Sequence, residues 1–119
     1  MRHVLPAPTA LVLGLLLVIL APGYSRGHGD VTERRVLDNE RVVVVEYVFP
    51  AGFRGEEHVA PVDEFAFVLD GEFKVVTKGK GTQRVRPGEI EWAPKGSIHY
   101  SMNDTQKPAR VLVVLLKER

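Results

Sequence analysis

The chain has 119 residues, with 16 Lys and Arg against 15 Asp and Glu, no cysteine, and 45% hydrophobic residues. A chain of this length forms at most one domain. The absence of cysteine excludes a disulfide-stapled small protein and a lipid anchor attached to cysteine. The nearly balanced charge does not indicate a nucleic-acid partner, so we expect none.

The first 25 residues have the three-part pattern of a secretory signal peptide. A basic start precedes the uncharged apolar run of residues 9–21, and small and turn-forming residues follow at 22–25. This run of 13 residues is shorter than the roughly 20 that a membrane helix needs. We therefore expect export to the periplasm or the medium, with no stable membrane span after cleavage. The alternative is a protein tethered by an uncleaved N-terminal anchor.

Residues 26–35 are polar and contain two glycines, which predicts a mobile leader. His28 has a glycine on each side and is interpreted as part of that leader rather than as a metal ligand. Residues 36–119 are predicted to form a single domain.

The pattern of this domain is that of an all-β protein. Residues 41–49 (RVVVVEYVF) are β-branched and aromatic, and their continuous apolar middle predicts a strand buried on both faces. Phe65, Phe67, Phe73 and Trp92 are interpreted as core residues. Further strands are predicted at 65–69, 72–77, 83–86, 89–92, 98–103 and 110–117, with turn residues between them. We expect the last strand beside the first in a sandwich or barrel.

Two spaced patterns stand out within this domain. The first consists of Gly52, His58, Ala60, Glu64 and Gly71, and the second of Gly88, Pro94, Gly96, His99 and Asn103. Together they resemble the two motifs of the cupin family, which has His where this chain has Ala60; the other nine positions agree. The resemblance implies an all-β domain with the cupin-type double-stranded β-helix, a jelly-roll barrel.

The resemblance also implies a metal site inside the barrel. Carried over by position, the candidate ligands are His58, Glu64 and His99. Imidazole and carboxylate groups suit a divalent metal ion, which could be Fe, Mn, Ni, Cu or Zn, and a barrel mouth leaves coordination positions for a small-molecule ligand or substrate. Positions 58 and 60 are two apart on a strand, so both are expected to face inward.

Ala60 leaves three interpretations of this site open. In the first, His58, Glu64 and His99 still bind a metal as a two-His-one-carboxylate set. In the second, another residue replaces the missing imidazole, and Glu56 is the candidate because it lies two residues before His58. In the third, the metal is lost and the barrel is a binding or structural module, with a pocket that Ala60 widens.

The predicted function is therefore that of an exported small cupin that binds a divalent metal and a small molecule, with dioxygenase-like oxidoreductase activity as the enzyme class that the resemblance favours. The alternative is a non-catalytic, metal-free cupin module that binds a small molecule or has a structural role. A homodimer is a further expectation, because cupins commonly pair through their outer strands and residues 111–116 form a strongly apolar run.

Overall fold

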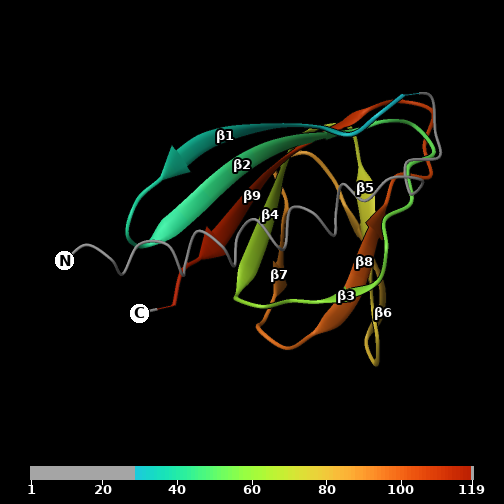
Figure 1. The fold of residues 1–119 in the computed structure, drawn as a ribbon. Helices are drawn as coiled ribbons and strands as arrows, with labels where there is room; N and C mark the ends of the chain where they lie inside the picture. The colour runs from blue at the N-terminus through green and yellow to red at the C-terminus, as the bar shows by residue number, and fades with distance from the viewer. Residues whose placement is uncertain (1–28, 119) are drawn as a thin grey trace.

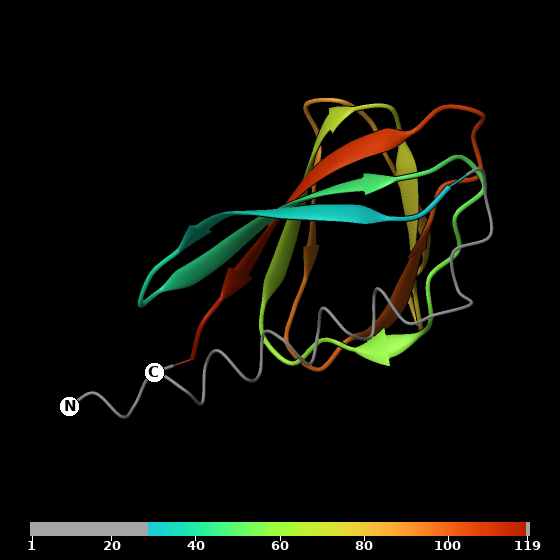
Figure 2. The same cartoon turned by 45° about the horizontal axis from the view of Figure 1, so that its top comes forward.

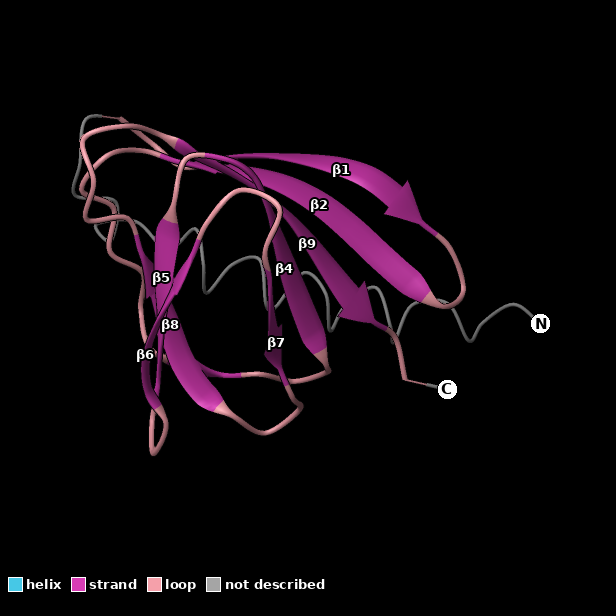
Figure 3. Cartoon of the chain, turned by 180° about the vertical axis from the view of Figure 1, so that it is seen from behind, coloured by secondary structure: helices cyan, strands magenta, loops and turns pink. Residues whose placement is uncertain are grey.

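The computed structural model of the chain describes residues 29–118. Their regular structure is entirely β (Figure 3). The strands are β1 (Thr32–Asp38), β2 (Val42–Phe49), β3 (His58–Val59), β4 (Glu64–Asp70), β5 (Phe73–Thr77), β6 (Gly81–Val85), β7 (Ile90–Ala93), β8 (Ile98–Met102) and β9 (Ala109–Leu116). No helix within residues 29–118 is long and apolar enough to cross a membrane. The predicted signal peptide and His28 lie outside the described residues.

The strands form two antiparallel sheets that face each other (Figure 1). The five-stranded sheet has the order β1-β2-β9-β4-β7, and the four-stranded sheet has the order β3-β8-β5-β6. β9 lies between β2 and β4, and it pairs with β2 along the whole length of both strands. This confirms the prediction that the last strand lies beside the first apolar one, and the arrangement is the double-stranded β-helix.

The apolar strands alternate in burial instead of being buried on both faces. In β2 the inward-facing side chains are fully buried, whereas the intervening ones are only half-buried. β4 alternates in the same way up to Val68. The prediction of two buried faces was wrong because the outer face of the five-stranded sheet carries no second layer among the described residues. The buried inner face forms the core, which includes Val43, Val45, Phe49, Val68 and Val111.

The outer face of this sheet is nevertheless apolar. Trp92 is 57% exposed and stacks on Phe65, with ring centroids 6.3 Å apart. Phe67 is half-buried on the same face, next to the exposed Ile90. The assignment of Trp92, Phe65 and Phe67 to the core was therefore wrong, while Phe73 is buried as expected.

β1 replaces much of the predicted mobile leader. Thr32–Asp38 pairs with β2, so Thr32–Arg35 are part of the sheet rather than of a free tail. Every residue of β1 is exposed, which explains why its composition resembles that of a loop. Arg34 Nη2 donates to Glu46 on β2 at 2.7 Å, so the charged side chains belong to an edge strand. The β1–β2 hairpin extends beyond the body of the barrel (Figure 2).

Two motif residues hold the connections of the barrel in place. Asn103 is fully buried, and its side-chain amide donates to the carbonyls of Phe49 and Lys107 at 3.1 and 2.8 Å. Gly71 has φ +76°, and a Cβ there would lie 2.3 Å from the carbonyl oxygen of Pro108. Both residues therefore fix connections of the barrel rather than take part in its chemistry.

Candidate metal centre

The two motif histidines meet across the pairing of β3 with β8. His58 is the register partner of His99, and their Nε2 atoms are 3.1 Å apart. Antiparallel partners on one face bring their side chains together, so the ladder itself creates this contact. The predicted convergence of the two motifs thus has a direct cause in the backbone pairing.

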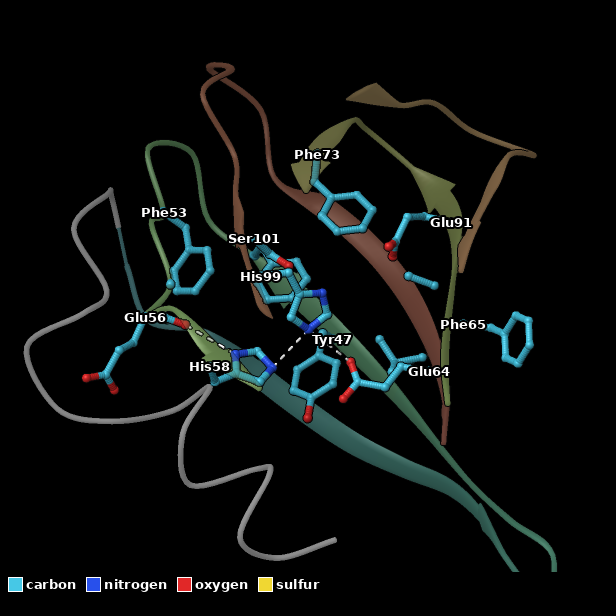
Figure 4. A pocket seen from close by; sticks show the side chains of 14 residues that line it. Tyr47, Phe53, Glu56, His58, Glu64, Phe65, Phe73, Glu91, His99 and Ser101 are labelled. Atoms are coloured by element: carbon cyan, nitrogen blue, oxygen red, sulfur yellow. Dashed lines mark hydrogen bonds and ion pairs between the residues drawn. The ribbon is translucent and has the colours of Figure 1, made fainter. Parts of the chain in front are cut away.

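Glu64 reaches the same point from the opposite sheet. It is the first residue of β4 and is buried, at 8% exposure. Its Oε1 lies 3.4 Å from His99 Nε2. The ligand atoms of His58, Glu64 and His99 all lie within 4.8 Å of one another, so the three predicted residues form one group that could hold a metal ion. Figure 4 shows the two imidazoles and the carboxylate turned toward one another inside the barrel.

A backbone contact orients the His58 ring. His58 Nδ1 donates to the carbonyl oxygen of Glu56 at 3.2 Å. A hydrogen on Nδ1 leaves Nε2 as the lone-pair nitrogen, and Nε2 is the atom that faces His99 and Glu64. Burial lowers the pKa of His58 below its usual range, although the hydrogen bond to Glu56 opposes this shift. The neutral, metal-ligating form is therefore the favoured one.

The spacing of these atoms fits a single ion. Two ligands at about 2.1 Å from an ion, with angles of about 90–110° between them, lie about 3.0–3.4 Å apart. The two separations that involve His99, 3.1 Å to His58 and 3.4 Å to Glu64, agree with that requirement. Two buried atoms of the group, Glu64 Oε2 and His99 Nδ1, have no hydrogen-bond partner among residues 29–118. A donor set of two imidazoles and a carboxylate, with an unused carboxylate oxygen, suits a divalent transition metal.

The group opens into a cavity of about 40 Å³ inside the barrel. Since roughly 10–15 Å³ of such volume holds one water molecule, the cavity accommodates an ion with a few small ligands. Its walls are mainly aromatic and aliphatic, and they include Phe49, Phe53 and Phe73. Tyr47 also lines it; its hydroxyl is buried without a hydrogen-bond partner among the described residues, and burial raises its pKa. The site is thus a partly closed, weakly polar chamber.

Position 60 faces inward as the sequence predicted, but it does not line the cavity. Val59 is 56% exposed and Ala60 is 1% exposed, so positions 58 and 60 do face the interior as expected. However, Ala60 is not among the residues that line the cavity, and its backbone is bound to the Gly96–Ser97 turn. The expectation that Ala60 widens the pocket is therefore wrong. Ala60 is buried where its backbone pairs with the turn that precedes β8.

Glu56 does not replace the missing imidazole. Its carboxylate is not part of the three-residue group, and in Figure 4 it points away from the two histidines. Glu56 contributes through its main-chain carbonyl, which orients His58. The substitute-ligand interpretation was wrong because the chain before β3 is not extended far enough for residues 56 and 58 to share a face: the strand begins at His58.

A second buried carboxylate was not predicted. Glu91 on β7 is 6% exposed and lines the cavity. Burial raises its pKa; the charges of His99 and Lys80 oppose that shift and Glu64 adds to it. The sequence places it in a short strand, EIEW, in which alternation allows either the two glutamates or Ile90 and Trp92 to face inward. The pairing of Glu91 with Ala66 on β4 turns the Glu91 side chain inward, and this pairing is known only from the structure of the sheet.

The fold and this site define a class of protein: a small antiparallel double-stranded β-helix that carries two histidines and a glutamate inside the barrel. The family model of the Cupin domain matches residues 45–115. The chain belongs to this family.

Comparisons with solved structures agree with that assignment. The protein TT1209 from Thermus thermophilus is 26% identical, with a TM-score of 0.69 over 81% of this chain and 92% of that one. The polyketide cyclase RemF from Streptomyces resistomycificus is 28% identical, with a TM-score of 0.68 over 75% of this chain and 66% of that one. A cupin superfamily protein from Desulfitobacterium hafniense shares the fold at 18% identity, with a TM-score of 0.67 over 78% and 82%. A search of the curated proteins finds no match.

Proposed function

We propose that this chain is an exported cupin that binds one divalent metal ion through His58, Glu64 and His99 and acts on a small molecule held beside the ion. The observation that carries the proposal is the contact geometry: His99 Nε2 lies 3.1 Å from His58 Nε2 and 3.4 Å from Glu64 Oε1. A two-His-one-carboxylate set leaves coordination positions open, and an ion bound there would supply Lewis-acid or redox chemistry. A dioxygenase-like oxidoreductase is the enzyme class that this donor set favours.

The protein's own groups have distinct tasks in this proposal. The Glu56 carbonyl keeps the His58 ring in the orientation that directs Nε2 inward. Phe49, Phe53 and Phe73 restrict water around the site, which strengthens the electrostatic interactions of a bound ion. Tyr47 places an unpartnered hydroxyl in the same chamber, where it can donate a hydrogen bond to a bound ligand.

A metal-free module is the second candidate, and one observation favours it. His99 Nε2 lies within reach of both His58 Nε2 and Glu64 Oε1, at 3.1 and 3.4 Å, so the three side chains can also act as polar partners of one another. In that case the contacts among His58, His99 and Glu64 would stabilise the chamber, which would hold a small organic molecule alone.

Melting temperatures separate the two candidates. Chelator-treated wild type is titrated with Fe(II), Mn(II), Ni(II), Cu(II) and Zn(II), beside the variant His99→Ala and the control Val59→Ala, which alters an exposed position on β3. Metal binding predicts a concentration-dependent rise for wild type and the control, and none for His99→Ala. Stabilisation by organic ligands alone, with no response to any of the five metals, would favour the metal-free module.

We further propose that the chain forms a homodimer through the apolar outer face of the five-stranded sheet. The charged groups there neutralise one another within the chain, because Glu46 binds both Arg34 and Arg110 at 2.7 and 2.9 Å. In a two-fold dimer the same surface of both subunits forms the interface. A face whose charges are already paired and whose exposed side chains are apolar can therefore pack against the same face of a second copy. Its exposed members include Leu69, Ile90, Trp92 and Leu116.

Sedimentation velocity tests this pairing with Trp92→Glu against the control Val59→Glu, which alters a side chain of similar exposure on the other sheet. We expect a dimer for wild type and the control, and a monomer for Trp92→Glu. A monomeric wild type at micromolar concentration would contradict the proposal.

A further inference from the structure

Glu91 is a buried carboxylate whose burial the proposed metal centre does not explain. It is 6% exposed, and no hydrogen bond or ion pair holds its carboxylate among the residues that the structure describes. It does not belong to the group of ligand atoms around His99. Figure 4 shows its carboxylate turned inward from β7, on the side of the chamber occupied by Phe73. Its oxygens are not among the fully buried atoms that lack a partner, so they border open space, and a ligand group there would offset the cost of burying the carboxylate.

A second hollow begins at the same residue. Its volume is about 130 Å³, and Glu91 lines both this hollow and the metal chamber. The hollow lies at the seam between β6 and β7, the end strands of the two sheets, which are not hydrogen-bonded to each other. A Cβ added at Gly81, which also lines it, would meet nothing within 4 Å. Open space therefore adjoins Glu91 both in the metal chamber and at the seam.

The groups around the seam hollow favour hydroxyls as ligand groups. Thr77, Thr82 and Gln83 offer neutral donors and acceptors, and Glu91 offers a carboxylate acceptor. Lys80 also lines the hollow, and its positive charge disfavours a cationic ligand. A polyhydroxylated group can donate to the carboxylate and exchange hydrogen bonds with the neutral side chains.

The strand register places Glu91 close to the Glu64 ligand position. Glu64 pairs with Ala93, and Ala66 pairs with Glu91, so the two glutamates are diagonal neighbours on the inner face of β4 and β7. Diagonal neighbours are about 7–8 Å apart. Both glutamates line the same chamber, so a small molecule held beside the His58, Glu64 and His99 ligand atoms can also contact Glu91.

We propose that the seam hollow between β6 and β7, with Glu91 at its inner end, is a subsite for the hydroxyl groups of a small polyhydroxylated ligand whose metal-binding end lies beside His58, Glu64 and His99. The metal-binding end of this ligand rests on the proposed function, whereas the seam subsite does not. Glu91 is thus a specificity-determining residue.

Lactate and glycerate are the probes, because they share an α-hydroxycarboxylate that chelates metals and differ by one hydroxyl at C3. Each is titrated calorimetrically into metal-loaded wild type, Glu91→Ala, Glu91→Gln and the control Glu57→Ala, which removes an exposed carboxylate. Wild type and the control should bind glycerate at least about tenfold more tightly than lactate, as expected for a hydrogen bond to a charged group. In Glu91→Ala this preference should vanish, with lactate affinity and metal stoichiometry unchanged.

Equal binding of both probes by wild type, or a preference that survives in Glu91→Ala, would overturn the subsite. If Glu91→Ala does not fold, Glu91→Gln is compared instead; it keeps an acceptor but removes the charge, so the preference for glycerate should fall, and an unchanged preference would overturn the subsite. If wild type takes up no metal, the proposed function fails and the subsite is tested separately with glycerol at millimolar concentration on the metal-free protein. Shifts of the Gly81 and Gln83 amide signals that Glu91→Ala abolishes would support it, and unchanged signals would overturn it.

Discussion

The Nε2 atoms of His58 and His99 lie 3.1 Å apart although 41 positions separate the two residues in the chain. The contact follows from their direct pairing in the β3–β8 ladder. β3 is only two residues long, so few backbone hydrogen bonds hold His58 opposite His99. The position of the donor set thus depends on the turn around Ala60 and Ser97, whose main-chain groups are hydrogen-bonded at 2.8 Å.

Substitution of Ala60 by His should destabilise the protein rather than complete its donor set. Ala60 is 1% exposed and does not line the cavity, so an imidazole there overpacks the region below the Gly96–Ser97 turn. We expect Ala60→His to lower the free energy of unfolding by about 1–3 kcal/mol in chelator, measured by urea denaturation. Val59→His, at a 56% exposed neighbouring position, should change it by less than about 0.5 kcal/mol. Tighter metal binding by Ala60→His without loss of stability would show that the chamber reaches position 60.

The stability of the metal-free protein should depend on pH through Glu91. Burial raises the folded-state pKa of Glu91 above its ordinary value of 4.5, so its contribution to stability is complete below that value and is lost as the pH rises through the folded-state pKa. Glu91→Gln does not titrate. Its melting temperature relative to wild type should therefore increase as the pH rises from about 4.5 toward neutrality, reaching a few degrees above wild type.

Thermal melts in chelator across this pH range measure the difference directly. Glu57→Gln, at an exposed carboxylate, serves as the control and should follow wild type at every pH. A difference in melting temperature between Glu91→Gln and wild type that does not change with pH would mean that the Glu91 carboxyl has the same pKa in the folded and unfolded states.

Gly71→Ala should cost far more stability than Gly79→Ala. Both glycines have positive φ, +76° and +84°, so backbone strain is common to both substitutions. Only at Gly71 would the new Cβ clash, at 2.3 Å from the Pro108 carbonyl oxygen, while Gly79 has nothing within 4 Å. We expect about 1 kcal/mol for Gly79→Ala and at least about 3 kcal/mol for Gly71→Ala, measured by urea denaturation. Equal losses would indicate that the loop before β9 yields to the added methyl group.

Most of the strands and the three candidate ligands could be predicted from the sequence because each rests on a local signal. The run at residues 41–49 has the residue types of a strand, and the spacing around His58 and His99 resembles two family motifs. Positive φ at Gly71 and Gly88 agrees with the predicted turns. These features are decided by the residues themselves and by their near neighbours.

Features that depend on the second sheet or on solvent could not be predicted in this way. Trp92 is a large apolar residue and was assigned to the core, yet it lies on a face that nothing else in the described residues covers. Residues 32–35 have a loop-like composition, and only their pairing with β2 makes them a strand. The inward direction of Glu91 depends on a register that composition does not determine.

The most direct test of the central claim is elemental analysis of the protein purified without chelators and without a metal-binding affinity tag. The account predicts close to one divalent transition-metal ion per chain for wild type, and a loss of that metal in both His99→Ala and His58→Ala with the fold retained. Metal-free wild type that takes up none of the five candidate ions on titration, or full occupancy in both variants, would contradict it.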